Sequence, residues 1–125
     1  MANLTGMPAP ERISPLRISA YTACSSIGRG RAATLASLRT RTGGLRRNDF
    51  ENAQQISTYI GRVDGIEDTP LPSHLSHFDC RNNRLAWLTL QQDGFADTVA
   101  DAGRRYGAAR VAVVLGTSTS SIGAS

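Results

Sequence analysis

The chain has 125 residues, of which 40% are hydrophobic and 19% are charged, and its formal net charge is +4. This length allows one domain with a single core, and the balance of apolar and charged residues fits a globular protein rather than a disordered one. No apolar run approaches the roughly 20 residues that a membrane-spanning helix needs, and the N-terminal residues lack the basic and apolar regions of a signal peptide. We therefore expect a cytoplasmic protein that does not act at a membrane.

The positive charge is unevenly distributed along the chain. All 14 basic residues are arginine, and the stretch from Arg12 to Arg47 holds eight of them and no acid. Such a stretch can attract nucleic acid or an acidic protein by long-range steering. Because no aromatic platform or recognition-helix pattern accompanies the charge, we do not expect nucleic acid as a partner. A solvated arginine-rich helix face and an acidic protein partner both remain open.

The N-terminal half predicts a leader, a strand and a helix. Residues 1–15 carry three prolines and predict a flexible leader, and LRISAYTA (16–23) alternates apolar and polar residues as a short strand does. RAATLASLRTR (31–41) is rich in good helix formers, and TGG (42–44) supplies the glycine that commonly ends a helix. The apolar stripe of this helix consists of Ala33, Leu35, Ala36 and Leu38.

The middle of the chain predicts an extended segment and a loop. ISTYIGRVDGI (56–66) is the extended segment. The stretch 67–80 holds two prolines and shows no hydrophobic periodicity, which predicts a loop. Asp79 is placed to cap a helix that begins near Cys80. The candidate buried positions of the extended segment are Ile56, Tyr59 and Val63.

The last third predicts helix followed by a buried strand. Residues 81–107 carry apolar residues at helical spacing, and Gly94 predicts a kink or a break into two helices. RVAVVLGTSTS (110–120) is a β-branched run that favours a strand in the middle of a sheet covered on both faces. Alternating strands and helices predict an α/β fold. Since few residues follow this strand, we expect an incomplete N-terminal part of a larger layered fold.

Cys24 is the first candidate for chemistry. It lies between the predicted strand and helix, where helix N–H groups can activate a thiol. A nucleophilic cysteine also needs a base, and the two histidines, His74 and His77, fall in the proline-bounded loop. Cys24 and Cys80 are far apart in the sequence and do not form the cysteine pattern of a secreted, disulfide-bonded protein, so we expect reduced thiols.

Two further patterns suggest ligands weakly. HLSHFDC (74–80) gathers His, Asp and Cys, but a structural zinc site needs four ligands, of which the fourth would be the distant Cys24. We therefore expect no metal. GTSTSSIG (116–123) follows the predicted central strand, where α/β folds place ligand loops, yet it lacks the glycine spacing of a dinucleotide or P-loop fingerprint.

Taken together, the segments resemble the opening of the β-ketoacyl-acyl-carrier-protein synthases, members of the thiolase-like superfamily. RISAYTACSSIGRGRAATLASLRTRTGGL is similar to the family's first strand, its small-residue turn with Ser26 and Gly28, its first helix, and its stop at Thr42-Gly43-Gly44-Leu45. YIGRVDGIE resembles the extended piece that follows, and FDCRNNRLAWLTLQQDGFADTVADAGRRYGAARVAVVLGTSTSSIG resembles two helices and a strand ending in "VxxGT". The resemblance covers roughly residues 16–125 and implies a mixed sheet with covering helices.

The resemblance implies that Cys24 is not the catalytic cysteine. Residues 22–26 spell Thr-Ala-Cys-Ser-Ser, which is the family's nucleophile motif, but that motif occurs in a later strand-helix unit. Cys24 aligns instead with the first turn, and His74 and His77 correspond to a variable loop. The family's catalytic cysteine and histidines lie downstream, so we expect no catalytic residue in this chain and no activity from it alone.

The chemistry implied for the complete family is decarboxylative condensation without metal or redox cofactor. A cysteine thiolate takes the acyl group from an acyl carrier protein, and the malonyl-carrier thioester then loses CO₂ and attacks the acyl-enzyme. The complete enzyme is expected to form a homodimer or heterodimer and to act in fatty acid or polyketide-type biosynthesis. By position, Ser118, Thr119 and Ser120 match the segment that gates the acyl pocket.

Two other classes of function remain open. The chain can be a non-catalytic module that binds an acidic acyl carrier protein through its arginine-rich first helix. It can also be a small thiol enzyme that depends on Cys24. The candidate partner-binding residues of the module are Arg29, Arg31, Arg39 and Arg41.

Overall fold

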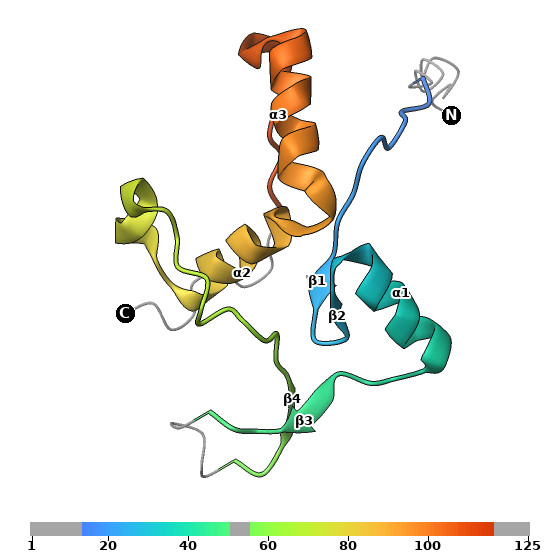
Figure 1. Cartoon of the computed structure of the whole chain (residues 1–125), viewed down its shortest axis with the longest axis vertical. Helices are drawn as coiled ribbons and strands as arrows, with labels where there is room; N and C mark the ends of the chain where they lie inside the picture. Colours follow the sequence, from blue (N-terminus) through green and yellow to red (C-terminus); the bar gives the residue numbers. More distant parts are fainter. Residues whose placement is uncertain (1–13, 51–55, 117–125) are drawn as a thin grey trace, which may run out of the picture.

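The computed structural model describes residues 14–50 and 56–116 of the chain. Figure 1 shows a short hairpin packed beside one helix, a second small sheet, and two helices joined end to end. The predicted leader, 1–15, falls almost wholly outside these residues. Ser118, Thr119 and Ser120, the residues expected to gate an acyl pocket, also lie outside them.

The first sheet is a hairpin of two-residue strands. β1 (Cys24–Ser25) pairs antiparallel with β2 (Gly28–Arg29), and Cys24 lies opposite Arg29. The strand predicted over 16–23 is therefore wrong for the described residues, because residues 14–23 have no neighbouring strand and form no ladder. They run as an extended path into the hairpin (Figure 1).

Helix α1 (Gly30–Thr40) confirms the helix predicted over 31–41 to within one residue. Its end differs from the prediction, because Arg41 and not a glycine adopts the left-handed conformation, with φ 54°. Thr42 N–H donates to Ser37 O at 2.9 Å and Arg41 N–H donates to Leu38 O at 3.3 Å, which is a Schellman motif. The apolar stripe of α1 remains largely exposed, as Leu38 shows with 62% of its surface accessible.

The second sheet consists of two short strands, one before residue 50 and one after residue 56. β3 (Leu45–Arg47) pairs antiparallel with β4 (Tyr59–Gly61), so the extended segment predicted over 56–66 contains a real but short strand. Val63 is buried as predicted, whereas Ile56 and Tyr59 are 63% and 64% exposed and the prediction for them is wrong. Ile56 precedes β4 and Tyr59 is its first residue, and within the described residues the sheet has only two strands.

The helical region begins with a short 3-10 helix, η2 (Ser73–Phe78), inside the predicted loop. Helix α2 (Arg81–Leu90) follows, with Cys80 rather than Asp79 at its N-cap position. The predicted cap is therefore wrong, because the Asp79 carboxylate instead accepts two hydrogen bonds from Arg84, each at 2.6 Å. A bidentate arginine pair stabilises a carboxylate more strongly than one backbone N–H does.

A break at Gly94 separates α2 from the next helix, as predicted. The short turn η3 (Gln92–Gly94) contains two residues with positive φ, Asp93 at 59° and Gly94 at 66°. Helix α3 (Phe95–Tyr106) then projects away from the hairpin (Figure 1), and the 3-10 turn η4 (Ala108–Arg110) ends it. The left-handed pair at the turn gives α2 and α3 different directions.

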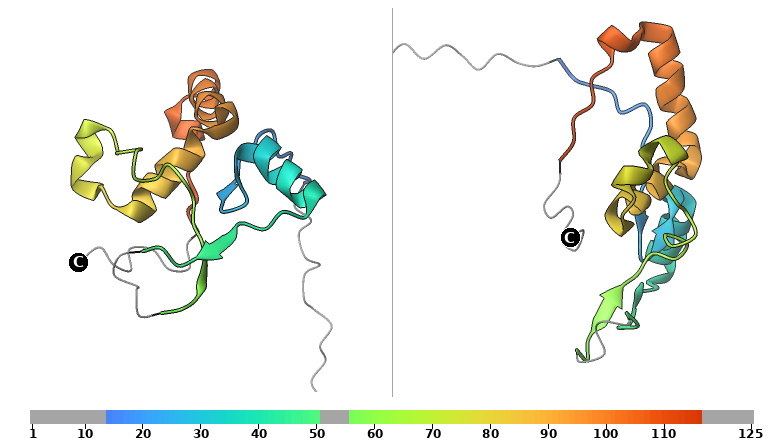
Figure 2. Two further views of the ribbon diagram at one scale, coloured as in Figure 1. Left: turned by 60° about the horizontal axis from the view of Figure 1, so that its bottom comes forward. Right: turned by 90° about the vertical axis from the view of Figure 1, so that its left-hand side faces the viewer.

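The strand predicted over 110–120 is absent from its described part, because residues 111–116 pair with no other strand of the described chain. They return beside α3 (Figure 2), and most of their apolar side chains are exposed. The exposed fractions are 90% for Val113, 94% for Val114 and 86% for Leu115.

The core of the described chain is small. Ile66 is 1% exposed, and it packs with Val63 and Leu88 and with the partly buried Cys24 and Leu85. The described chain is thus a mixed α/β structure with two small antiparallel sheets, and it contains no helix long and apolar enough to cross a membrane.

Candidate functional site

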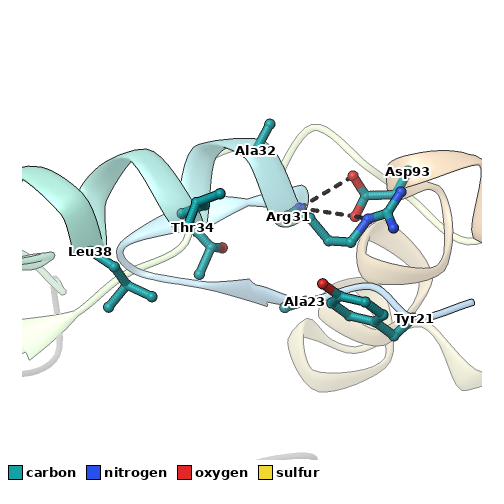
Figure 3. Close-up of a pocket in the computed structure, with 8 residues that line it drawn as sticks. Tyr21, Ala23, Arg31, Ala32, Thr34, Leu38 and Asp93 are labelled. Carbon is teal, nitrogen blue, oxygen red and sulfur yellow. Dashed lines mark hydrogen bonds and ion pairs between the residues drawn. The ribbon is translucent and has the colours of Figure 1, made fainter. Parts of the chain in front are cut away.

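The candidate site is an open groove beside α1, with a volume of about 490 Å³. Figure 3 shows Tyr21 and Ala23 on one side of the groove, α1 on the other, and Leu38 at the end away from Arg31 and Asp93. This volume lies in the range that small-molecule and peptide sites occupy. The residues that line it are Tyr21, Ala23, Arg31, Ala32, Thr34, Leu35, Leu38 and Asp93.

Asp93 closes the polar end of the groove. Its carboxylate accepts hydrogen bonds from the backbone N–H of Arg31 at 2.9 and 3.2 Å and from the Thr22 hydroxyl at 2.9 Å. Its Oδ2 also lies 3.6 Å from Arg31 Nε. The turn at η3 therefore supplies the N-terminal cap that α1 lacks in its own sequence, since Arg29 makes no side-chain cap.

The environment of Asp93 favours its charged form. Burial alone would raise the pKa of this carboxyl, but the hydrogen bonds from Arg31 N–H and Thr22 and the charge of Arg31 outweigh burial, so its pKa is lower than usual. The guanidinium of Arg31 also lies over the Tyr21 ring, 5.2 Å from its centroid. The charges at this end of the groove are thus paired with each other.

The four arginines proposed to bind a partner divide into two pairs. Arg31 is engaged with Asp93 and Tyr21, and Arg29 Nη1 donates to the backbone O of Asp64 at 3.2 Å. Arg39, in the last turn of α1, and Arg41, just after it, make no ion pair within residues 14–50 and 56–116. Arg39 and Arg41 therefore keep their guanidinium groups available for an acidic partner, Arg31 is already paired with a carboxylate, and Arg29 is held by one hydrogen bond to a backbone carbonyl.

Cys24 lies in β1 and packs against the core of Val63, Ile66 and Leu88. It is a free, partly buried thiol within a hairpin, and it does not begin a helix, because α1 starts at Gly30. The two histidines lie in η2, where the rings of His77 and Phe78 are 3.8 Å apart. The structure therefore assigns Cys24 a packing role.

The stretch with His74, His77, Asp79 and Cys80 forms no ligand cluster in the structure. Asp79 pairs with Arg84, and this guanidinium lowers the pKa of the Asp79 carboxyl. Across the ranges that the structure describes, no group of three or more His, Cys, Asp or Glu side chains is arranged to hold a metal ion.

A second ionic cluster, around Arg62, was not anticipated from the sequence. Arg62 contacts the carboxylates of Asp49 at 3.0 Å and Glu67 at 3.3 Å, and its guanidinium lies over the Phe50 ring. Arg81 covers the same ring and also pairs with Glu67, at 3.2 Å. The pKa of both carboxyls is lowered, for Asp49 chiefly by the hydrogen bond from Arg62 and for Glu67 chiefly by a backbone hydrogen bond, with the charges of Arg81 and Arg62 adding to it. This cluster joins the residues that follow β3, the loop after β4, and the first turn of α2.

Asp93 and Tyr21 were also missed as site residues. The sequence signal available for Asp93 was its place before Gly94 at the predicted helix break, because Asp and Gly tolerate the left-handed conformation that a tight turn needs. No family model matches the chain, and no curated protein and no solved structure is similar to it. The groove itself offers apolar walls and a paired polar end, which suits the binding of an apolar segment or ligand.

Proposed function

We propose that the chain is the N-terminal part of a β-ketoacyl-acyl-carrier-protein synthase of thiolase-like fold. The observation that carries the proposal is the exposure of Val113, Val114 and Leu115, each at least 86% accessible. A β-branched, uncharged run of this kind is stable when it lies inside a sheet covered on both faces. The order of a small-residue turn at Ser26 and Gly28 followed by helix α1 supports the same proposal.

In this proposal the chain supplies scaffold and no reacting group. The complete enzyme would transfer an acyl group from an acyl carrier protein to a cysteine thiolate, and decarboxylation of the malonyl thioester would supply the carbanion that attacks it. Cys24 would take no part, because it packs against Ile66 and Leu88. The further residues of the complete enzyme would cover the apolar segment 111–116 with a layered sheet, and the complete protein would be a homodimer or heterodimer.

Two measurements test this proposal. The reading frame of the source DNA past the codon for Ser125 is expected to encode a second Thr-Ala-Cys-Ser-Ser motif followed by histidines. The 125-residue protein, incubated with acyl carrier protein charged with an acyl chain, is expected to gain no acyl mass. An acyl adduct on Cys24 would instead establish a thiol enzyme, and a frame that lacks the second motif would remove the ketosynthase assignment.

A second candidate function is the docking of an acidic acyl carrier protein at the C-terminal end of α1. The observation that favours it is that Arg39 and Arg41 have no acidic partner in the described part of the chain, whereas Arg31 is paired with Asp93 and Arg29 donates a hydrogen bond to the backbone O of Asp64. Exposed cations of this kind accelerate and orient an encounter with an anionic surface. The docking set would thus be narrower than the four arginines of the sequence prediction.

Fluorescence anisotropy of labelled holo-acyl carrier protein tests the docking. Binding is expected at low ionic strength and should weaken steeply with added salt, because exposed charges are screened. The double variant Arg39→Glu, Arg41→Glu should abolish it. The matched double variant Arg105→Glu, Arg110→Glu, with the same charge change at the far end of α3, should bind within about threefold of wild type. Equal loss in both variants would show that net charge alone, and no defined surface, attracts the carrier.

A further inference from the structure

Two unpartnered features of the chain are complementary to each other. The first is the segment Val111–Gly116, where Val113, Val114 and Leu115 are 86–94% exposed. From Ala112 to Gly116 the backbone makes no hydrogen bond to any residue that the structure describes. The second feature is the groove between the extended residues Tyr21 and Ala23 and helix α1. Each copy thus presents an unpaired extended segment and an open groove.

The groove has the walls that a strand requires. Leu35 and Leu38 of α1 are 46% and 62% exposed, and they line the groove together with Tyr21 and Ala23. Residues 14–22 make no backbone–backbone hydrogen bond within the described chain, so their N–H and C=O groups are free to pair with an added strand. Addition of a strand beside a free backbone, with side chains in a neighbouring apolar groove, is a general mode of recognition.

The chemistry of the segment matches the groove. The segment from Val111 to Gly116 has no charged residue, and the charges at the polar end of the groove, Arg31 and Asp93, are already paired. An apolar strand can therefore enter without leaving a charge unpaired. Arg39 and Arg41 are exposed and are not among the residues that line the groove.

We propose that two copies of this chain associate by exchanging strands, with residues 111–116 of each copy lying in the α1 groove of the other. The contact is reciprocal, and such a contact generates a closed twofold dimer. Six residues of strand are about 20 Å long, and two such contacts reach the order of 1,000 Å² that a specific interface buries. This inference concerns the 125-residue chain by itself, because in the complete enzyme of the proposed function the same segment would be covered by further residues of that enzyme. A dimer of the 125-residue chain would therefore neither support nor contradict the ketosynthase assignment.

The salt dependence of the dimer follows from its composition. The contact itself is apolar, while both partners carry a net positive charge of +4. Added salt screens the repulsion between them, so dimerisation should strengthen with ionic strength. Carrier docking through Arg39 and Arg41 would weaken under the same conditions, and the two forms of association are therefore distinguishable.

Cross-linking between single-cysteine copies tests the exchange directly. In a Cys24→Ala, Cys80→Ala background, one chain carries Ala23→Cys and a differently tagged chain carries Val113→Cys or, separately, Val114→Cys, because alternate strand residues face opposite sides. Oxidation of the mixture should give a cross-linked heterodimer with one of the two segment variants. Replacing the segment cysteine by Ala100→Cys, on exposed α3, should give none. A cross-link that forms only when both cysteines lie in one chain would overturn the proposal.

Complementation provides the second test. One double variant, Leu35→Asp with Leu38→Asp, places charges in the apolar groove. The other, Val113→Asp with Leu115→Asp, places charges in the apolar segment. Each double variant should be monomeric by light scattering. A mixture of the two retains one intact groove and one intact strand and should recover a heterodimer. Circular dichroism checks that both variants keep the helix content of wild type, and the cross-linking result stands if either does not. A wild-type chain that remains monomeric at high salt and high concentration would overturn the proposal.

Discussion

The carboxylate of Asp93 lies at the N-terminus of α1 and accepts the backbone N–H of Arg31 at 2.9 Å, across 62 positions of sequence. The same residue has a φ of 59°, so the turn that separates α2 from α3 also presents the cap of α1. Gly30, the first residue of α1, lies so close that a Cβ there would be 3.2 Å from Asp93 Oδ1. One residue thus connects the hairpin, α1 and the two C-terminal helices.

Replacing Asp93 is expected to loosen this connection. Asp93→Ala removes the cap of α1. It also puts alanine at a position of positive φ, which aspartate tolerates better because its side chain can form local hydrogen bonds. The urea midpoint should therefore fall by roughly 0.5 M or more. Asp93→Asn keeps an acceptor oxygen and tolerates the left-handed conformation, so it should lose about half as much. Asp68→Asn, an exposed aspartate that makes no ion pair in the described chain, is the matched control. Equal midpoints for Asp93→Ala and Asp68→Asn would contradict the capping role.

Acid should destabilise the protein through its paired carboxylates. The pKa values of Asp49, Glu67, Asp79 and Asp93 are all lower in the folded chain than their usual values. A carboxylate of this kind contributes stability that is fully present above its unfolded pKa, about 4, and is lost as the pH falls through the lower folded pKa. Urea midpoints should therefore be constant between about pH 6 and pH 5 and should drop below about pH 4. Asp93→Asn should show a shallower drop than wild type, and an unchanged profile would remove Asp93 from the set.

The sequence predicted those elements that depend on the backbone preferences of neighbouring residues. The helix formers of 31–41 and the glycine at 94 predict α1 and the break between α2 and α3, because both depend on backbone preferences of neighbouring residues. Asp79 was wrongly predicted as a cap, because the sequence does not reveal that the guanidinium of Arg84 competes for the same carboxylate. Helix α1 ends at Arg41 rather than at a glycine, so the general preference for glycine at helix ends also failed to predict the observed residue.

The long-range features were not predictable from local pattern. The strands predicted over 16–23 and 110–120 depend on neighbours, and a run such as Val113–Leu115 becomes a strand only where another backbone pairs with it. The contact of Asp93 with Arg31 and that of Arg62 with Asp49 also depend on how distant elements meet. The groove beside α1, formed by residues from both ends of the chain, follows from those same contacts.

The packing of Cys24 predicts that its thiol can be removed without loss of chemistry. Cys24→Ala should leave acyl transfer from charged carrier protein unchanged, at background, and should cost about 1 kcal/mol of unfolding free energy because the side chain contacts the core. Intact-mass spectrometry and urea denaturation measure the two effects. Cys80→Ala, which changes the other free thiol, is the control. Acyl mass in wild type that disappears in Cys24→Ala alone would identify a thiol enzyme.

The small core makes Ile66 unusually important for stability. Ile66 is 1% exposed and packs between Val63 and Leu88, so Ile66→Ala should cost about 3 kcal/mol through lost burial and the cavity left behind. Ile66→Val removes one methylene and should cost about 1 kcal/mol. Leu45→Ala, at a position 68% exposed, should change stability by less than about 0.5 kcal/mol. A similar loss for Leu45→Ala and Ile66→Ala, measured by urea denaturation, would show that the core lies elsewhere.

Two adjacent glycines should respond differently to the same substitution. A Cβ at Gly44 would lie 2.3 Å from the backbone O of Ser26, whereas a Cβ at Gly43 would meet nothing within 4 Å. Gly44→Ala must therefore push the chain before β3 away from the β1–β2 turn, at a cost of about 2 kcal/mol. Gly43→Ala only restricts the unfolded chain and should be neutral or slightly stabilising. Thermal unfolding of the two variants measures the difference, and a lower midpoint for Gly43→Ala than for Gly44→Ala would contradict the close approach at Ser26.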